Sequence, residues 1–340
     1  MVVDEKLSSA SNPTVRRQKD GAYEITWPEA LVRGRVSIFV GESPGTIDRA
    51  APAAVVHDCR QVMIRGLEPE ARHYFLIQPE GGPGLIAAER RVRLEGSVNF
   101  RDLGGYETFD GKHVKWGQVF RSDGLYRLSD RDRALLLRMG LRTVIDFRSA
   151  EETRRFPDLL PEKAGLKYLN LPMADDKVDT VSAMDLLKKG DKSWLTEDFM
   201  IQSMIRNVEN FAGVWKAVLE RLAAEQGRPL VFHCTGGKDR AGASAALILL
   251  ALGVPEETVI EDHQLSNMFI AVLYDRIGQL LAKSGIDFEE VKVFFTAPRE
   301  SILALLDHLR RNYGTPENYL IARSGLSRQT LIRLREELLE

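Results

Sequence analysis

The sequence of 340 residues predicts an α/β protein in which a small all-β sandwich, residues 1–95, precedes a larger domain, residues 96–340. In the larger domain we expect a central, mostly parallel sheet flanked by helices. Three observations support this prediction. The chain is longer than a single core usually organises. Its first quarter carries alternating strand patterns without helices between them. After Ser97, short apolar strands alternate with helical segments, as in parallel α/β sheets.

The predicted sandwich consists of short segments in which apolar and polar residues alternate with period two. Glycines at positions 41, 45, 66, 81, 82 and 84 separate these segments and indicate turns. The segments are Ala22–Trp27, Arg35–Val40, Arg60–Arg65 and His73–Ile77. Strands spaced in this way without intervening helices favour an antiparallel sandwich.

The larger domain is predicted from a run of strands and helices in alternation. The expected strands are Thr143–Phe147, Lys167–Leu171 and Pro229–His233. The expected helices are Asp130–Met139, a long region Leu195–Glu225, the apolar segment Gly242–Leu252 and most of Glu256–Glu340. The apolar Pro229–His233 segment is short enough for a strand buried on both faces of a sheet.

Composition narrows the function classes. A formal net charge of -2 argues against nonspecific nucleic-acid binding, which needs a basic excess. Cys59 and Cys234 lie far apart, so a secreted disulfide scaffold is not expected. The N-terminus lacks the apolar core of a signal peptide, and Ala241–Val254 is too short to span a membrane. We therefore expect a cytoplasmic protein without a transmembrane segment. Export without a cleaved signal would leave no trace in the sequence.

The segment from Val231 to Gly242 carries the expected chemistry. It links the buried strand to the apolar helix, so backbone N–H groups converge at the positive end of the helix dipole. Gly236 and Gly237 allow these amides to turn inward. Such a loop can cradle a dianion. We expect the phosphate of a substrate to contact the residues of this loop: Thr235, Gly236, Gly237, Lys238, Ala241 and Gly242.

Cys234 opens the loop and is the predicted nucleophile, because the thiolate is the reactive form of cysteine. The amides, Lys238 and Arg240 all favour that anion. The planar guanidinium of Arg240 can hold two phosphate oxygens at once, and Lys238 adds a point charge. These groups neutralise the developing charge, so no metal or other cofactor is expected. A lone cysteine is more often a small buried hydrophobe. Here the flanking strand, glycines, arginine and helix favour the catalytic interpretation.

The loop sequence His-Cys-x-x-Gly-Lys-Asp-Arg, residues 233–240, resembles the protein tyrosine phosphatase superfamily, and most closely its bacterial PtpB/IphP-type phosphatases. Ser97–Tyr106 is similar to that family's Asn-Phe-Arg-Asp signature. Further matches are Phe120–Ser122, Asp146–Ser149 and Gly325–Leu334. Separately, Trp27, the turn Gly66–Pro69 and Tyr74 resemble a fibronectin type III-like domain, which is a candidate for binding a protein partner.

The resemblance implies further site residues. The family's general acid lies in a loop after a Leu-Pro strand end, which places Asp175 there, with adjacent Asp176 as an alternative and Asp239 as a third candidate. For Asp175 and Asp176 a solvated acidic loop is an equally plausible interpretation. His233 is expected to orient the backbone of the nucleophile rather than act as a base. Residues expected to hold the loop in place, mainly as a salt-bridge network, are Asn99, Arg101, Asp102, Asp146 and Arg148.

One position departs from the family. Ala241 follows the arginine, where the family usually has Ser or Thr, whose hydroxyl stabilises the departing thiolate. Slow hydrolysis of a phosphocysteine is therefore expected.

The resemblance implies phosphoprotein substrates, with phosphotyrosine first and phosphoserine or phosphothreonine after it. Lys238 in the pattern Cys-x-x-Gly-Lys-x-Arg also resembles phosphoinositide phosphatases. The alternatives are a phosphate-binding module with little turnover and a sulfurtransferase. A third, DNA binding through a helix-turn-helix at Tyr319–Leu334, is less favoured than a structural helical pair.

Overall fold

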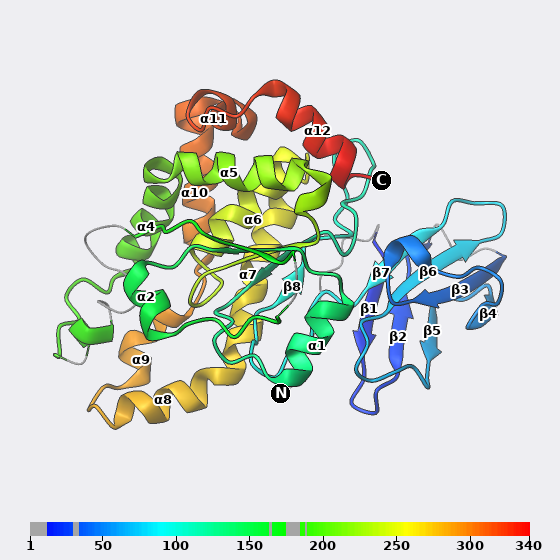
Figure 1. The fold of residues 1–340 in the computed structure, drawn as a ribbon, viewed down its shortest axis with the longest axis horizontal. Coiled ribbons are helices and arrows are strands. Elements are labelled where there is room, and N and C mark those ends of the chain that lie inside the picture. The colour runs from blue at the N-terminus through cyan, green and yellow to red at the C-terminus, as the bar shows by residue number, and fades with distance from the viewer. Residues whose placement is uncertain (1–11, 30–33, 163–164, 175–183, 188) are drawn as a thin grey trace.

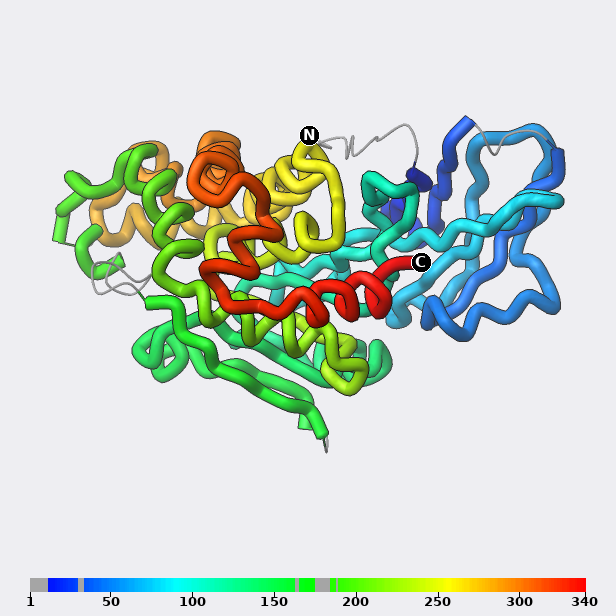
Figure 2. The backbone as a smooth tube through the Cα atoms, turned by 90° about the horizontal axis from the view of Figure 1, so that it is seen from above, coloured from blue at the N-terminus to red at the C-terminus, as the bar shows by residue number. Residues whose placement is uncertain are grey.

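The computed structural model describes residues 12–29, 34–162, 165–174, 184–187 and 189–340. It has two parts, a strand-rich part at one end and a larger body in which helices surround a sheet (Figure 1). Figure 2, turned by 90°, shows the same separation. The predicted fold class is confirmed.

The strand-rich part consists of two antiparallel sheets with the orders β1-β2-β5 and β4-β3-β6-β7. Their strands are β1 (Thr14–Arg17), β2 (Tyr23–Thr26), β3 (Arg35–Gly41), β4 (Ala54–His57), β5 (Gln61–Ile64), β6 (Tyr74–Pro79) and β7 (Leu85–Ala88). Ile25 of one sheet and Ile38 and Phe75 of the other are fully buried in one core. The four predicted strands correspond to β2, β3, β5 and β6. The sequence pattern missed β1, β4 and β7, each four residues long.

The larger body is built on a five-stranded sheet with the order β11-β10-β12-β9-β8. The strands are β8 (Arg101–Asp102), β9 (Val119–Ser122), β10 (Thr143–Asp146), β11 (Lys167–Asn170) and β12 (Leu230–His233). The pairs β10–β11, β10–β12 and β12–β9 are parallel, and only β8 runs antiparallel. All residues of β12 are buried, because the strand lies at the centre of the sheet.

Helices cover this sheet. They are α1 (Asp130–Arg138), α2 (Ala150–Arg155), α4 (Glu197–Asn210), α5 (Ala212–Ala223), α6 (Arg240–Ala251), α7 (Glu256–Ile270), α8 (Tyr274–Ala282), α9 (Phe288–Val291), α10 (Arg299–Tyr313), α11 (Pro316–Ala322) and α12 (Arg328–Leu338). The region predicted as one long helix is two, because Phe211 leaves helical geometry with φ -117° and ψ 30°. Figure 1 shows α11 and α12 at the top of the body and α8 and α9 at its lower edge. Within the described ranges, no helix has the length and apolar character needed to cross a bilayer.

The α11–α12 pair is the segment that resembled a helix-turn-helix. Tyr319 and Leu320 of α11 and Leu331 and Leu334 of α12 are buried in the main core of the larger body. Their apolar faces pack inward, as expected of a structural pair.

A buried ion pair joins the sandwich to the larger body. The Arg72 guanidinium lies 2.9 Å from the Asp102 carboxylate, and both side chains are almost fully buried. Beside them the Trp116 indole donates to the Ile86 carbonyl at 2.9 Å. Arg90 lies over the rings of Tyr106 and Trp116, 3.8 and 4.9 Å from their centroids. These contacts fix the sandwich to the sheet edge at β8.

Replacing Arg72 with methionine is expected to lower the free energy of unfolding by about 3–5 kcal/mol, because it leaves Asp102 buried without a counter-ion. Burial already raises the pKa of Asp102 in spite of Arg72. Urea unfolding measures the effect. The control is Arg65→Met, which breaks the solvent-exposed pair with Asp20 and should cost about 1 kcal/mol or less. Equal effects of the two substitutions would contradict the prediction.

Candidate active site

The site is built at the carboxyl end of β12. The strand ends at His233, Cys234 opens the following loop, and α6 begins at Arg240. The N–H of Gly237 donates to Cys234 Sγ at 3.2 Å. This amide is therefore directed at the atom that the sequence predicts as the nucleophile. Only 2% of Cys234 is exposed.

Gly237 is required by the shape of the loop. Its φ is +71°, a conformation that side chains disfavour. A Cβ at this position would lie 2.6 Å from both the Ser122 carbonyl oxygen and the Asp123 nitrogen. The loop therefore packs against the end of β9 with no space for a side chain.

The carbonyls of the loop are held from behind. Asn99 Nδ2 donates to the Gly236 carbonyl at 3.1 Å, and Arg121 donates to the Gly237 carbonyl at 2.8 Å. In a trans peptide the C=O and the following N–H point in opposite directions. The N–H groups of Gly237 and Lys238 are therefore turned to the other side, and that of Gly237 faces the sulfur.

Asp262 of α7 organises this support. Its carboxylate accepts from Arg101 at 3.2 Å and from Arg121 at 2.5 Å, and all three side chains are buried. Burial alone would raise the pKa of Asp262, but the two guanidinium charges lower it well below the usual range. Arg101 also donates to the Asn99 side chain. Of the predicted supporting residues, Asn99 thus contacts the loop itself, and Arg101 holds Asn99.

Arg240 is held by Glu152, a residue that the sequence interpretation missed. Its guanidinium donates to both Glu152 oxygens, at 2.7 and 2.8 Å, and to the Phe147 carbonyl at 3.1 Å. Thr235 Oγ1 donates to Glu152 at 2.5 Å. Burial alone would raise the pKa of Glu152, but the Arg240 and Thr235 contacts lower it to about 2. Glu152 thereby fixes both ends of the loop.

The sequence contained a signal for Glu152. Ser149 and Glu152 form a capping box at the start of α2, in which each side chain accepts from the other's backbone N–H. The spacing Ser-x-x-Glu identifies such a helix start, yet nothing in it indicates that the carboxylate also reaches Arg240.

A cavity of about 410 Å³ opens in front of the loop and includes Cys234, Lys238, Asp239 and Arg240 in its lining. Apolar side chains from α4 and the residue after it, from α8 and from the segment before α10 form one part of its wall: Phe199, Met200, Phe211, Ile277, Leu280, Phe294 and Phe295. Positive side chains also line it: Arg127, Arg206 and Arg276. The sulfur is therefore nearly buried but faces a ligand-sized cavity.

Two of the candidate general acids, Asp175 and Asp176, lie outside the described residues. The chain reaches the cavity wall at Met173 and lines it again at Met184. The third candidate, Asp239, accepts from the Lys238 ammonium with both oxygens at 2.7 Å. In this conformation Asp239 is an acceptor, and Lys238 is held beside the ring of Phe294 at 5.9 Å.

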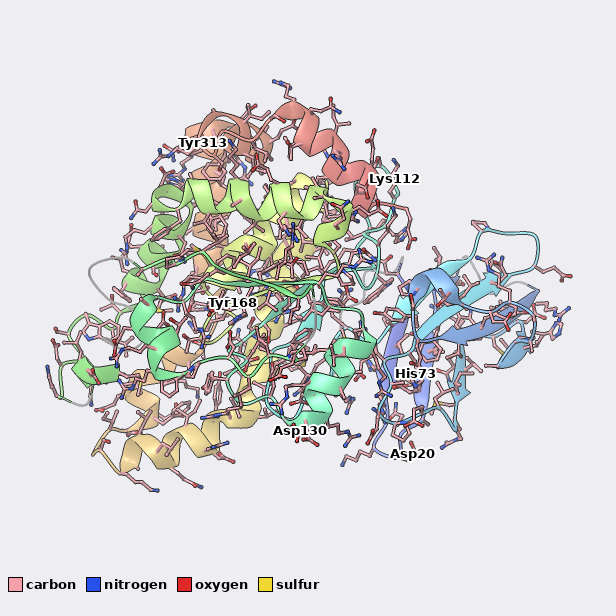
Figure 3. The ribbon with its side chains drawn as sticks, viewed as in Figure 1. Asp20, His73, Lys112, Asp130, Tyr168 and Tyr313 are labelled. Carbon is pink, nitrogen blue, oxygen red and sulfur yellow. The ribbon has the colours of Figure 1, made fainter. Side chains whose placement is uncertain are left out.

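Asp146, Arg148 and His233 form a second buried network beside the loop. Arg148 binds Asp146 at 2.8 Å and Asp158 at 2.7 Å. The Tyr168 hydroxyl, labelled in Figure 3, donates to Asp146 at 2.8 Å. His233 Nδ1 lies 3.4 Å from the Cys234 carbonyl.

The same network contains a possible metal-ligand set, since Asp146, Asp158 and His233 have ligand atoms within 4.8 Å of one another. Arg148 already places its positive charge on both carboxylates.

The other predicted residues lie elsewhere. Asp102 lies away from the loop, where it pairs with Arg72. The remaining predicted loop residues lie at the start of α6, with Ala241 buried and Gly242 packed so closely that a Cβ would come within 3.0 Å of His263.

Residues 92–340 of this chain match the sequence model of a protein family described as the tyrosine phosphatase family. The triple specificity protein phosphatase PtpB of Mycobacterium tuberculosis is 31% identical over 72% of this chain and 98% of its own. A tyrosine-protein phosphatase of Nostoc commune is 30% identical over 60% of this chain and 61% of its own.

Proposed function

Because the chain belongs to the tyrosine phosphatase family and is a protein tyrosine phosphatase, we propose that it acts through a covalent phosphocysteine on Cys234. The observation that supports this proposal most is the pairing of two contacts at opposite ends of one loop. An amide is directed at the Cys234 sulfur at 3.2 Å, and Glu152 holds Arg240 through both carboxylate oxygens. The first prepares a nucleophile, and the second prepares a clamp for phosphoryl oxygens.

In the first step, the Cys234 thiolate attacks phosphorus and the bond between phosphorus and the ester oxygen breaks. Loop N–H groups and Arg240 bind the oxygens of the phosphoryl group, whose charge they stabilise in the transition state. A carboxylic acid protonates the leaving oxygen, and we assign this role to Asp175. This assignment is supported by Met173, which lies two residues before Asp175 in the chain and lines the cavity.

In the second step, water attacks phosphorus, the sulfur–phosphorus bond breaks and the thiolate leaves. Water loses a proton to the same carboxylate. The buried Ala241 offers no hydroxyl to this departing thiolate. We therefore propose that hydrolysis of the phosphocysteine limits turnover.

Ala241→Ser is expected to raise kcat about tenfold and to reduce the burst of product, because it supplies a hydrogen bond to the leaving thiolate. Stopped-flow release of p-nitrophenol measures both quantities. Ala243→Ser, at another buried alanine of α6, is the control and should not raise kcat. A wild-type time course without a burst, combined with an unchanged kcat in Ala241→Ser, would contradict the proposal.

The substrate range is proposed to include phosphotyrosine, phosphoserine or phosphothreonine, and phosphoinositides. Lys238 supports the lipid component, because its ammonium lines the cavity and could exchange Asp239 for a second phosphate. The relative from M. tuberculosis is named for triple specificity.

Lys238→Met is expected to lower kcat/KM for a phosphoinositide at least tenfold more than for a phosphotyrosine peptide, because it removes one charge-assisted contact to a second phosphate. Malachite-green phosphate release measures both substrates in parallel. Arg127→Met, at a positive residue elsewhere on the cavity wall, serves as the control. Equal losses for both substrates would contradict a lipid-selective role.

A substrate panel tests the proposed function as a whole. Phosphate release from phosphotyrosine, phosphoserine and phosphoinositide compounds should be accompanied by a phosphorylated peptide containing Cys234 after acid quench. Stoichiometric phosphate binding without release would instead indicate a binding module.

We also propose that the sandwich is a separate, fibronectin type III-like domain ending near residue 95 that binds a protein partner. Its own core, which includes Ile25, Ile38 and Phe75, supports independent folding. Cooperative thermal unfolding of residues 1–95 expressed alone tests this, and a chain that stays unfolded would contradict it.

A further inference from the structure

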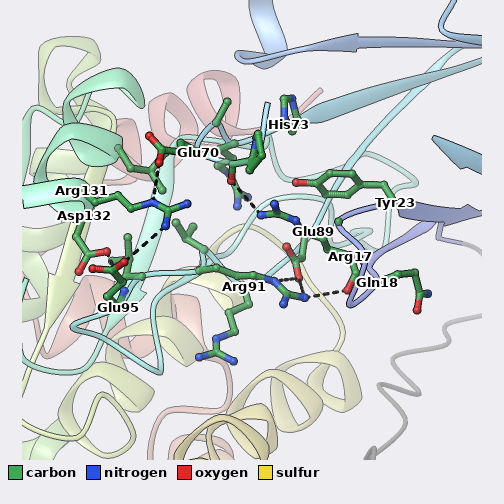
Figure 4. Close-up of a pocket in the computed structure, with 18 of the residues that line it drawn as sticks. Arg17, Gln18, Tyr23, Glu70, His73, Glu89, Arg91, Glu95, Arg131 and Asp132 are labelled. Atoms are coloured by element: carbon green, nitrogen blue, oxygen red, sulfur yellow. Dashed lines mark hydrogen bonds and ion pairs between the residues drawn. The ribbon is translucent and has the colours of Figure 1, made fainter. Parts of the chain in front are cut away.

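A second cavity, of about 370 Å³, lies between the sandwich and the larger body. Figure 4 shows it, with Tyr23, Arg17 and His73 of the sandwich on one side and Arg131, Asp132 and Glu95 of the larger body and the connecting segment on the other. Its volume falls within the range of small-molecule sites, which are frequent at domain interfaces. It is separate from the cavity in front of Cys234.

The cavity presents hydrogen-bond donors. Tyr23 is 4% exposed, its hydroxyl points into the cavity in Figure 4, and in the described ranges this hydroxyl has no hydrogen-bond partner. The Lys19 ammonium likewise pairs with no described residue. Arg131 lies 3.3 Å from Glu70 and 3.6 Å from Glu95, and each of these side chains is about half exposed. Such loose pairs contribute little and are readily exchanged for a ligand.

The charge of the side chains that line the cavity also favours a ligand that accepts hydrogen bonds. Six lysine and arginine residues line the cavity against four carboxylates, and one of the four, Asp132, is occupied in capping backbone N–H groups. Arg72 is neutralised by Asp102 behind the wall. The local excess is positive although the whole chain carries a formal net charge of -2. A ligand with several anionic oxygens fits these donors.

One chain segment connects this cavity with the phosphate loop. Glu95 lines both cavities. The N–H groups of Glu95 and Gly96 both donate to Asp132 at 2.8 Å. Four residues on from Glu95, Asn99 supports the Gly236 carbonyl. Four residues of chain therefore separate the wall of this cavity from a side chain that holds the Cys234 loop.

We propose that the cavity between the two domains is a binding site for a small polyanion, bearing two or more carboxylate or phosphoryl groups, whose occupancy changes turnover at Cys234. Binding itself is independent of the phosphatase reaction. Tyr23, Lys19 and Arg131 are its recognition residues, and the segment 95–99 transmits the change.

Isothermal titration of the full chain tests the proposal, with citrate as a tricarboxylate probe and methylenediphosphonate as a phosphoryl probe. Saturating orthovanadate is present to block the catalytic loop. The double variant Lys19→Gln/Arg131→Gln is expected to bind at least tenfold more weakly than wild type. Lys216→Gln/Arg311→Gln removes the same charge from exposed positions of α5 and α10 and should bind like wild type. Tyr23→Phe removes one donor and should weaken binding severalfold.

The stronger of the two probes identifies the anion class. Absence of binding by both probes at millimolar concentration would overturn the proposal, as would equal binding by the double variant and its control. The effect of binding on turnover is measured separately, as kcat for p-nitrophenyl phosphate with and without the probe that binds more tightly. A change in kcat that disappears in Lys19→Gln/Arg131→Gln supports it, and a kcat unaffected by bound probe rules it out.

Discussion

Cys234→Ser is expected to lower kcat by at least about ten-thousand-fold, as removal of a nucleophile does in other covalent enzymes. A serine hydroxyl is not ionised at neutral pH, so the Gly237 amide and Arg240 have no anion to stabilise. The exchange of sulfur for oxygen keeps the shape of the buried side chain. Stability should therefore change by about 1 kcal/mol or less. Single-turnover hydrolysis of a phosphotyrosine peptide measures the loss.

The same variant should still bind the peptide, because Arg240 and the loop amides remain in place. Fluorescence anisotropy with a labelled phosphotyrosine peptide checks this retained affinity. Cys59→Ser is the matched control, since Cys59 is an exposed thiol of the sandwich and should leave kcat unchanged. If Cys234→Ser kept a few per cent of activity, another group would have to be the nucleophile.

Glu152→Gln is expected to lower kcat/KM by about a hundredfold to a thousandfold, the usual cost of losing one preorganised group at a developing charge. The amide can accept only one of the two Arg240 hydrogen bonds, so the guanidinium loses its fixed orientation. Thr235 loses its charged partner as well. Steady-state kinetics measures the effect. Glu151→Gln, at the adjacent exposed acid that pairs with Arg154, is the control and should have little effect.

The Glu152 carboxylate also predicts that the free energy of unfolding depends on pH. Its pKa is about 2 in the folded chain, against 4.5 as the ordinary value. A lowered pKa stabilises the folded state above the ordinary value, by about 3 kcal/mol here, and this contribution is lost as pH falls from about 4.5 towards 2. Wild type should therefore be more stable than Glu152→Gln at pH 7, and the difference should shrink in acid. A difference that is constant between pH 7 and pH 3 in urea unfolding would contradict the assignment.

The Cys234 loop could be singled out from the sequence because the residues that characterise it are close together in the chain. Cys234, the two glycines and Arg240 lie within seven consecutive residues, between a strand and a helix that the apolar pattern identifies. Gly237 illustrates the limit of such reasoning. Its presence indicates a turn, but only its packing against Ser122 and Asp123 explains why a larger residue is excluded.

The residues that hold the loop could be assigned from sequence only in part. Asn99 and Arg101 were expected from resemblance and lie behind the loop, whereas Asp102, one residue further on, points to the sandwich and binds Arg72. Successive residues of a strand face opposite sides of the sheet, so neighbours in sequence serve different partners. Asp262, 161 residues from Arg101, had no pattern to identify it.

The sequence by itself determined the class of fold, the two-part organisation and the place of the loop that carries Cys234 and Arg240, the proposed nucleophile and clamp, since each depends on local periodicity or on a short motif. Tertiary structure decided which carboxylates orient Arg240 and support the loop, and where the second cavity lies. The physical reason is that buried charges must find partners in space. Spatial neighbours such as Glu152 and Arg240 are separated by 88 residues of chain, which no sequence period spans.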